Sequence, residues 1–279
     1  MVATPIGNLA DITLRALHVL SLVDAIACED TRHTQALLRA YGIDRPGSAL
    51  IALHQHNEQE AAERVVSRLA AGERIAFVSD AGTPAISDPG ARLVAAVHAA
   101  GLRTLPLPGA SSVTTALSVA GLDSHQFLFE GFIGSRGAER DAAIERLRNE
   151  PRAVVLLEAP HRIEALATAL AALGERRITV TRELTKQFES VTTMSAAAWP
   201  AWLASDPRHA RGEFAVVLHP APAQAGVGPG PGEQTLQVLM SEGLPLKQAV
   251  KIAAQLSGEP RNRLYERALE LRAGTAEDS

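Results

Sequence analysis

The stretch of residues 75–90 constrains the fold of this chain more than any other. It opens with an apolar run at 75–78 that has no polar face, which is typical of a parallel strand covered on both sides. The run gives way to a loop of small residues with two prolines and two aspartates. In open α/β sheets ligands bind beyond the carboxyl ends of the strands, and Gly82 allows the backbone to approach a ligand closely. The stretch predicts an α/β fold with a ligand site at this loop, with an ordinary surface turn as the alternative.

Composition narrows the class of protein. The 279 residues suffice for two domains, and 46% hydrophobic with 21% charged residues is ordinary for a globular chain. No apolar run approaches the roughly 20 residues of a membrane helix and no signal sequence is evident, so we expect a cytoplasmic protein without a membrane partner. The single Cys28 excludes a disulfide framework and a multi-cysteine zinc site. With a net charge of −4 and 4% aromatic residues, nucleic acid would bind at local basic patches, and not on a platform of stacked aromatics.

Residues 1–108 are expected to form a parallel α/β domain, because apolar runs alternate with helical patterns. Strands are predicted near residue 2 and at 23–28, 51–53, 75–78 and 103–107, with helices at 12–22, 34–41, 58–71 and 91–100. Asp30 and Arg32 follow the strand 23–28 and are candidates for chemistry, although capping of the next helix by Asp30 explains the same position. The pair His54 and His56 lacks a third ligand of defined geometry, so no metal site is predicted.

Residues 109–219 predict a second α/β domain. Ser111 and Ser112 open a helix, and the free amides and positive dipole at a helix start suit polar ligand atoms. Further strands are predicted at 127–132, 154–157, 178–181 and 214–218, with helices at 138–149 and 162–172. Polar residues again follow two strand ends, namely Glu158 after 154–157, and Arg182, Glu183 and Lys186 after 178–181.

Residues 220–232 are predicted to be a Pro/Gly-rich linker, because such a composition cannot bury a core. Its glycines match a dinucleotide-binding fingerprint only superficially, since the prolines remove amide donors. Residues 233–279 predict a small helical domain with helices at 234–240, 245–256 and 261–271, a pattern similar to a helix-turn-helix unit. Its basic residues either bind RNA phosphates or form a solvated surface: Lys247, Lys251, Arg261 and Arg263.

Motifs at 3–9, 28–34, 56–58, 79–90, 108–112, 158–162 and 182–186 extend the argument. Together they resemble those of the ribosomal RNA small subunit methyltransferase I family, within the tetrapyrrole methylase superfamily. The resemblance covers residues 2–218, and a C-terminal extension fits it. It implies S-adenosylmethionine as methyl donor and the ribose 2′-hydroxyl of a cytidine in 16S ribosomal RNA of the small subunit as acceptor. It also implies two α/β domains with the donor in the cleft between them, and a homodimer.

The resemblance assigns donor-binding positions to the residues that match the superfamily's motifs: Pro5, Gly82, Thr83, Ile86, Ser111, Ser112 and Glu158. One position departs from the pattern, because the acidic residue of the superfamily loop is Thr83 here. Asp80 is the candidate for the missing carboxylate.

Methyl transfer to an alcohol requires an aligned donor and a group that takes the hydroxyl proton. Candidates for this base are Asp30, Glu29, Asp80 and Glu183. Arg32, Arg182 and Lys186 would bind RNA phosphate or polarise the hydroxyl. The scheme does not require a metal.

Two alternatives stay open. A tetrapyrrole C-methyltransferase, acting on precorrin or uroporphyrinogen, would share the fold and the donor but methylate carbon. A non-catalytic RNA-binding assembly protein would use the C-terminal helices and hold the donor only as a structural ligand. Methyl transfer from labelled donor to each class of acceptor distinguishes them.

Overall fold

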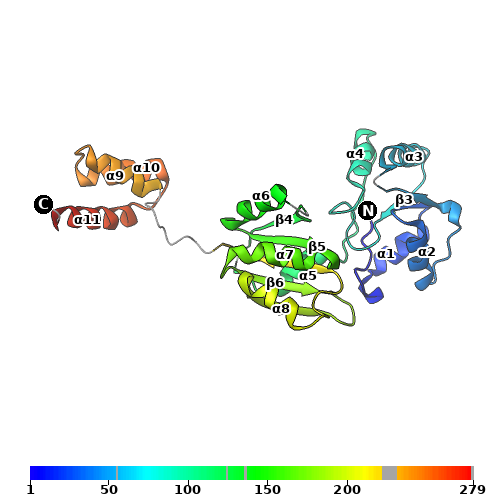
Figure 1. Ribbon diagram of the computed structural model, residues 1–279. Coiled ribbons are helices and arrows are strands. Elements are labelled where there is room, and N and C mark those ends of the chain that lie inside the picture. Colours follow the sequence, from blue (N-terminus) through cyan, green and yellow to red (C-terminus); the bar gives the residue numbers. More distant parts are fainter. Residues whose placement is uncertain (55, 124, 135–136, 222–230, 278–279) are drawn as a thin grey trace. The chain divides into compact units, whose positions relative to one another are not determined.

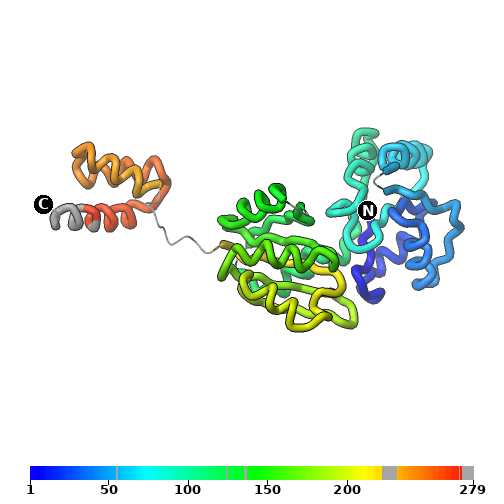
Figure 2. Tube along the Cα trace, in the orientation of Figure 1, coloured from blue at the N-terminus to red at the C-terminus, as the bar shows by residue number. Residues whose placement is uncertain are grey.

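The computed structural model describes residues 1–54, 56–123, 125–134, 137–221 and 231–277, and the chain divides into two compact units, Met1–Ala221 and Pro222–Ser279 (Figure 1). The first unit contains both α/β halves, and each sheet is built from one continuous stretch of sequence (Figure 2). The predicted boundary at residue 108 divides this unit internally and stays a prediction. Most of the predicted linker lies outside the described residues, and its last two residues already belong to a helix.

The first half is a parallel sheet of three strands in the order β2-β1-β3, with helices on both faces. Successive residues of β1 alternate between two cores: Ile26 packs with the first pair of helices, and Ala27 with the second pair. This confirms the prediction that the apolar runs are covered on both sides. The elements are β1 (Ala25–Cys28), β2 (Leu50–Ala52) and β3 (Ile75–Val78), with α1 (Leu14–Leu22), α2 (Thr31–Ala40), α3 (Glu58–Ala70) and α4 (Ala91–Ala99).

The strands predicted near residue 2 and at 103–107 are wrong as regular strands. In the described structure these segments form only isolated bridges. Val2 of the first segment pairs with Leu107 of the second, and Thr4 pairs with Gly82. Val2 donates its amide to the Phe77 carbonyl at 2.9 Å, and Leu107 donates to the Met1 carbonyl at 2.9 Å. Segments this short satisfy their few backbone groups without a continuous ladder.

The second half is a mixed sheet of five strands in the order β4-β5-β8-β6-β7, in which only β4 and β5 are parallel. Helix α5 packs on one face, and α6, α7 and α8 pack on the other. The edge strand β7 and helix α8 were not predicted, because a run of Ser and Thr at 190–195 gives little apolar signal. The elements are β4 (Phe127–Gly131), β5 (Ala153–Glu158), β6 (Arg177–Arg182), β7 (Ser190–Ser195) and β8 (Phe214–Leu218), with α5 (Ser112–Val119), α6 (Gly137–Arg148), α7 (Ile163–Leu170) and α8 (Trp199–Ser205).

The second unit is a bundle of three helices, α9 (Pro231–Ser241), α10 (Leu246–Ser257) and α11 (Arg261–Glu277). The predicted breaks at Gly243 and Gly258 are confirmed, since both glycines have φ near +75° (78° and 74°), the region that favours glycine. Leu236, Val250 and Leu264, one from each helix, are buried together.

Short 3₁₀ turns connect elements of the first unit at Leu9–Asp11, Gly47–Ala49, Pro160–Arg162, Ala171–Leu173 and Ala196–Ala198. None of the described helices combines the length and the apolar character needed to cross a membrane. These findings confirm the predicted α/β fold with a C-terminal helical unit.

Candidate functional site

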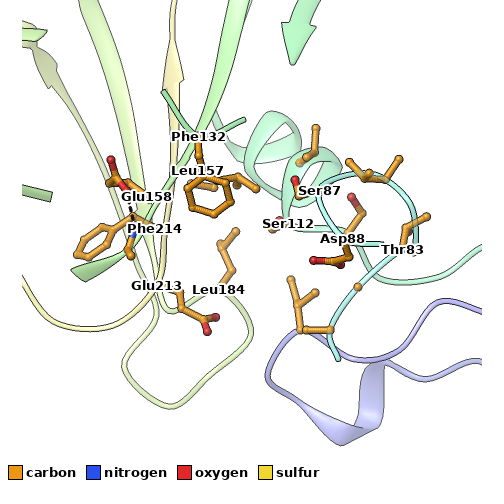
Figure 3. Close-up of a pocket in the computed structure, with 18 of the residues that line it drawn as sticks. Thr83, Ser87, Asp88, Ser112, Phe132, Leu157, Glu158, Leu184, Glu213 and Phe214 are labelled. Atoms are coloured by element: carbon orange, nitrogen blue, oxygen red, sulfur yellow. Dashed lines mark hydrogen bonds between the residues drawn. The ribbon is translucent and has the colours of Figure 1, made fainter. Parts of the chain in front are cut away.

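A cavity of about 390 Å³ lies between the loops of the two α/β halves (Figure 3). Its volume is in the range of small-molecule sites. One wall comes from the loop that follows β3 and from the N-terminal turn that contains Ile6. The other wall comes from the ends of β4, β5 and β8. The lining residues are Ile6, Ala81–Thr83, Ile86–Asp88, Ser111–Val113, Phe132, Leu157–Pro160, Leu184 and Glu213–Ala215.

The loop after β3 is held by backbone pairing. Gly82, with φ 81°, exchanges two hydrogen bonds of 3.0 Å with Thr4, and the Thr83 hydroxyl donates to the Ala110 carbonyl at 3.0 Å. Ala85 is left-handed at φ 66°, a strained state for a residue with a Cβ. The end of the loop is fixed by buried Glu58, whose Oε1 accepts from the Gly90 amide at 3.0 Å. These contacts anchor the loop at both of its ends, on either side of the residues that face the cavity.

Most predicted donor-binding residues line the cavity: Gly82, Thr83, Ile86, Ser111, Ser112 and Glu158. Among the described residues the lining does not include Pro5, which is buried next to the lining residue Ile6. Ser111 is the N-cap of α5 but makes no capping bond with its side chain. Its hydroxyl is thus available to a ligand.

Asp88 is an acidic residue of the cavity that sequence analysis did not single out (Figure 3). Burial raises the pKa of the Asp88 carboxyl above its ordinary value; a hydrogen bond with Ser79 opposes this rise, and the nearby charge of Asp80 adds to it. Burial, with the charges of Asp80 and Asp88, also raises the pKa of Glu29. The available signal was the position of Asp88 in the loop of the stretch 75–90, immediately before Pro89.

Asp30 and Arg32 bind each other at the start of α2. The Asp30 carboxylate accepts from the Arg32 amide at 2.8 Å and from Arg32 Nη2 at 2.9 Å. These hydrogen bonds with Arg32 lower the pKa of Asp30 to about 2. The described cavity lining includes neither Asp30 nor Arg32. Asp80 is also not part of the described lining, and its carboxylate accepts a hydrogen bond from the Asp30 amide at 3.3 Å. Asp30 is thus the N-cap of α2, as the capping alternative predicts, while a chemical role for the pair stays a prediction.

Glu183 and Lys186 form an ion pair beside the cavity. Glu183 Oε1 accepts from Lys186 Nζ and from the Glu213 amide, both at 2.9 Å. Burial acts to raise the pKa of Glu183, but the bonds from Glu213 and Lys186 outweigh it, so the pKa is lowered. Lys186 also pairs with the Glu213 carboxylate at 3.0 Å, and its stem lies against Gly7, where any Cβ would collide with it. The charges of Glu183 and Lys186 are therefore both engaged in ion pairs within the fold.

Arg182 likewise has internal partners. It donates to the Phe188 carbonyl at 2.8 Å and to the Ser190 hydroxyl at 3.2 Å. By contrast, the four basic residues predicted on the C-terminal helices all have exposed side chains: Lys247, Lys251, Arg261 and Arg263.

Glu158 has a fully buried side chain at the end of β5. Its Oε1 accepts from the Ala159 amide at 2.9 Å and lies 3.0 Å from Arg162 Nε, whereas Oε2 is buried without a hydrogen-bond partner in the described structure. An unpaired buried carboxylate oxygen is costly, which indicates a donor group from a ligand.

The walls of this cavity fit S-adenosylmethionine. The charged lining residues are Asp88, Glu158 and Glu213, and the described lining contains no Lys or Arg. Because Arg162 pairs with Glu158 and Lys186 pairs with Glu213 from outside the lining, the negative charge that these pairs leave uncompensated is that of Asp88. Such a site favours a ligand that carries positive charge, as the sulfonium and amino groups of the donor do. Leu157, Leu184 and Ala215 supply apolar surface for its adenine.

Comparisons with known proteins agree with this geometry. The family model "Tetrapyrrole (Corrin/Porphyrin) Methylases" matches residues 1–199, and "RsmI C-terminal HTH domain" matches residues 228–272. "Ribosomal RNA small subunit methyltransferase I" of Xylella fastidiosa (strain Temecula1) is 46% identical over 95% of this chain and 96% of its own length. The Escherichia coli O157:H7 protein of the same name is 45% identical over 97% and 94%.

Solved structures show the same fold at low identity. Diphthine synthase has a TM-score of 0.59 at 15% identity, with 78% of this chain and 88% of that one covered. Uroporphyrin-III C-methyltransferase from Thermus thermophilus, complexed with S-adenyl homocysteine, has a TM-score of 0.52 at 17% identity, with 77% and 94% covered. The chain belongs to the tetrapyrrole methylase family and, within it, to the ribosomal RNA small subunit methyltransferase I family.

Proposed function

We propose that this protein, an S-adenosylmethionine-dependent methyltransferase by its family, methylates the ribose 2′-hydroxyl of a cytidine in 16S ribosomal RNA. The observation that carries the proposal is the likeness, over nearly the full chain and including the C-terminal helices, to relatives named for the ribosomal small subunit. The family resemblance further leads us to propose a homodimer that acts in the cytoplasm.

The donor would be held by residues of both walls. Gly82 brings the backbone close, Ile86 and Leu157 offer apolar surface, and Ser111 and Ser112 offer hydroxyls at a helix start. When bound, S-adenosylmethionine supplies an electrophilic methyl group on a positively charged sulfur. Asp88 contributes negative charge to the same cavity, which favours the cationic donor.

Asp88 is the best-placed base for the acceptor hydroxyl. Asp88 would take the proton of the ribose hydroxyl, and S-adenosylmethionine, when held in this cavity, would supply the methyl group and keep the electron pair of the broken bond on its sulfur. A raised pKa makes Asp88 a better proton acceptor than Asp30 or Glu183, because hydrogen bonds from Arg32 lower the pKa of Asp30 and hydrogen bonds from the Glu213 amide and Lys186 lower the pKa of Glu183. Glu183 and Lys186 then shape the wall of the cavity and do not take part in proton transfer.

RNA phosphates would be bound by the exposed cations of the C-terminal unit. Lys247 and Lys251 lie four residues apart and so share one face of α10, while Arg261 and Arg263 lie at the start of α11. Arg182 and Lys186 are engaged within the first unit and contribute less.

The test is methyl transfer from radiolabelled donor to small ribosomal subunits that lack the modification, to naked ribosomal RNA and to tetrapyrrole precursors. We expect label in the RNA, released by nuclease digestion as 2′-O-methylcytidine. Label in a tetrapyrrole alone would identify a C-methyltransferase. Subunit binding without any transfer would identify an assembly protein.

A further inference from the structure

Phe132 is an exposed aromatic ring at the mouth of the donor cavity. Its side chain is 54% exposed, whereas Phe77 and Phe214 are 3% exposed. Phe127 and Phe188 are also largely exposed, but neither belongs to the described lining of this cavity. Figure 3 shows Phe132 on the wall formed by the second half, across the cavity from Asp88.

The backbone on both sides of Phe132 is fixed. The register of β4 against β5 shifts between Phe129 and Gly131, and Gly131 has φ 70°, so the chain turns out of the sheet immediately before the ring. Ile133, the next residue, is 5% exposed, and its carbonyl accepts a hydrogen bond from Arg162.

Arg162 is itself held by buried Glu158, at 3.0 Å from Nε to Oε1. The ring is thus presented to solvent by a segment that is anchored to the core at either end. Exposed apolar residues are common on this chain, but Phe132 is an exposed aromatic side chain that also lines the cavity, so its flat face is accessible to a ligand there.

The chemistry of the proposed reaction identifies that ligand. A ribose 2′-hydroxyl is attached to the carbon next to the one that bears the base. If the hydroxyl reaches the base-catalyst Asp88, the nucleobase must therefore lie within a few ångströms, at the mouth of the cavity. The adenine of the donor is better served by the apolar wall of half-buried Leu157 and buried Leu184 and Ala215.

We propose that Phe132 stacks on the nucleobase of the nucleotide whose ribose is methylated. This inference rests on the proposed function. Drawing a base out of its stack is unfavourable, and stacking on an aromatic side chain offsets part of that cost. The low aromatic content of the chain excludes a platform for many bases, but one ring suffices for one base.

The experiment compares Phe132→Leu, which keeps apolar volume and loses the aromatic face, with Phe132→Trp, which keeps an aromatic face. Phe127→Leu is the matched control, because Phe127 is 47% exposed, is not part of the described lining of this cavity and begins β4, the strand that Phe132 directly follows. Methyl transfer is measured against small-subunit concentration at saturating donor, and donor affinity is measured by calorimetry.

We expect Phe132→Leu to raise the half-saturating subunit concentration about 5- to 150-fold, the range that 1–3 kcal/mol of stacking implies. Phe132→Trp and Phe127→Leu should stay within about two-fold of wild type, and all variants should bind donor normally. Wild-type behaviour of Phe132→Leu would overturn the inference while leaving the proposed function intact. A loss confined to donor affinity would overturn it too, because the ring would then contact adenine. Wild-type protein that never methylates subunits would instead refute the proposed function, and this inference with it.

Discussion

Replacement of Asp88 by Asn tests the assignment of the proton acceptor. The substitution keeps the size of the side chain and a hydrogen-bonding partner for Ser79, and removes the ability to take a proton. A general base contributes about 10²- to 10⁴-fold to a rate. We expect kcat to fall at least about 10²-fold, which corresponds to about 2.7 kcal/mol of transition-state stabilisation. Glu29 is a poor substitute, because loss of the Asp88 charge removes one of the effects that raise its pKa.

For the same variant, Asp88→Asn, we expect the stability to change in the direction opposite to the rate. Burial raises the folded-state pKa of Asp88 above its value in the unfolded chain. Between these two pKa values the folded state holds the proton that the unfolded state has lost, so stability falls as pH rises through this window. At neutral pH the buried charge costs stability, and Asp88→Asn removes it. The unfolding temperature should therefore rise or stay the same while the rate falls.

Single-turnover methyl transfer at saturating donor, measured across pH, is the assay. The wild-type rate should fall as pH drops through the raised pKa of Asp88, and the variant should lose this acid limb. Asp44→Asn is the control, since Asp44 is exposed and is not part of the described cavity lining. A variant with wild-type kcat, or one that keeps the acid limb, would refute the role of Asp88.

Three further predictions concern other parts of the chain. Ile86→Arg should weaken donor binding at least about 10-fold without lowering the unfolding temperature, because it places positive charge at a 52%-exposed position beside a cationic ligand; unchanged affinity by calorimetry would remove this loop from the site. Asp30→Asn should cost at most about 1 kcal/mol in chemical denaturation and leave kcat intact, since Asn caps helices nearly as well; a 10²-fold rate loss would restore Asp30 as the base. A chain that ends at Ala221, the limit of the first compact unit, should keep donor affinity and lose salt-sensitive RNA affinity; full-rate methylation of subunits by it would contradict RNA docking by the C-terminal helices.

Local pattern was sufficient to predict much of the fold. The uniformly apolar run at 75–78 is a strand buried on both faces, and the helices after residue 230 end at Gly243 and Gly258 as predicted. Prediction failed where tertiary pairing decides the state. The run at 103–107 has strand composition, yet it forms only the isolated bridge at Leu107 and a hydrogen bond from the Met1 amino group to the Leu105 carbonyl. The edge strand β7 pairs with β6 through polar residues that carry no apolar alternation.

The residues of the site were likewise predicted only in part. Positions defined by backbone geometry, such as Gly82 and Ser111, follow from the motif and line the cavity. The acids could not be ranked from sequence, because their basicity depends on neighbours in space. Asp30 and Glu183 each have a cation within 3 Å, whereas Asp88 is half-buried and forms no ion pair with a described residue.

The pairing of Val2 has a consequence for how the protein is made. Its backbone partners are Phe77 and Leu107, which leave the ribosome long after Val2 itself. The sheet β2-β1-β3 can assemble once the nascent chain extends a little beyond β3. At that stage the segment that carries Thr4, which pairs with Gly82, has only part of its backbone partners. Because distant contacts close slowly, the turn at residues 4–7 should dock late in synthesis. The wall of the donor cavity would then be completed only after the first half is otherwise folded, so an incomplete chain would have a sheet but no competent methylation site.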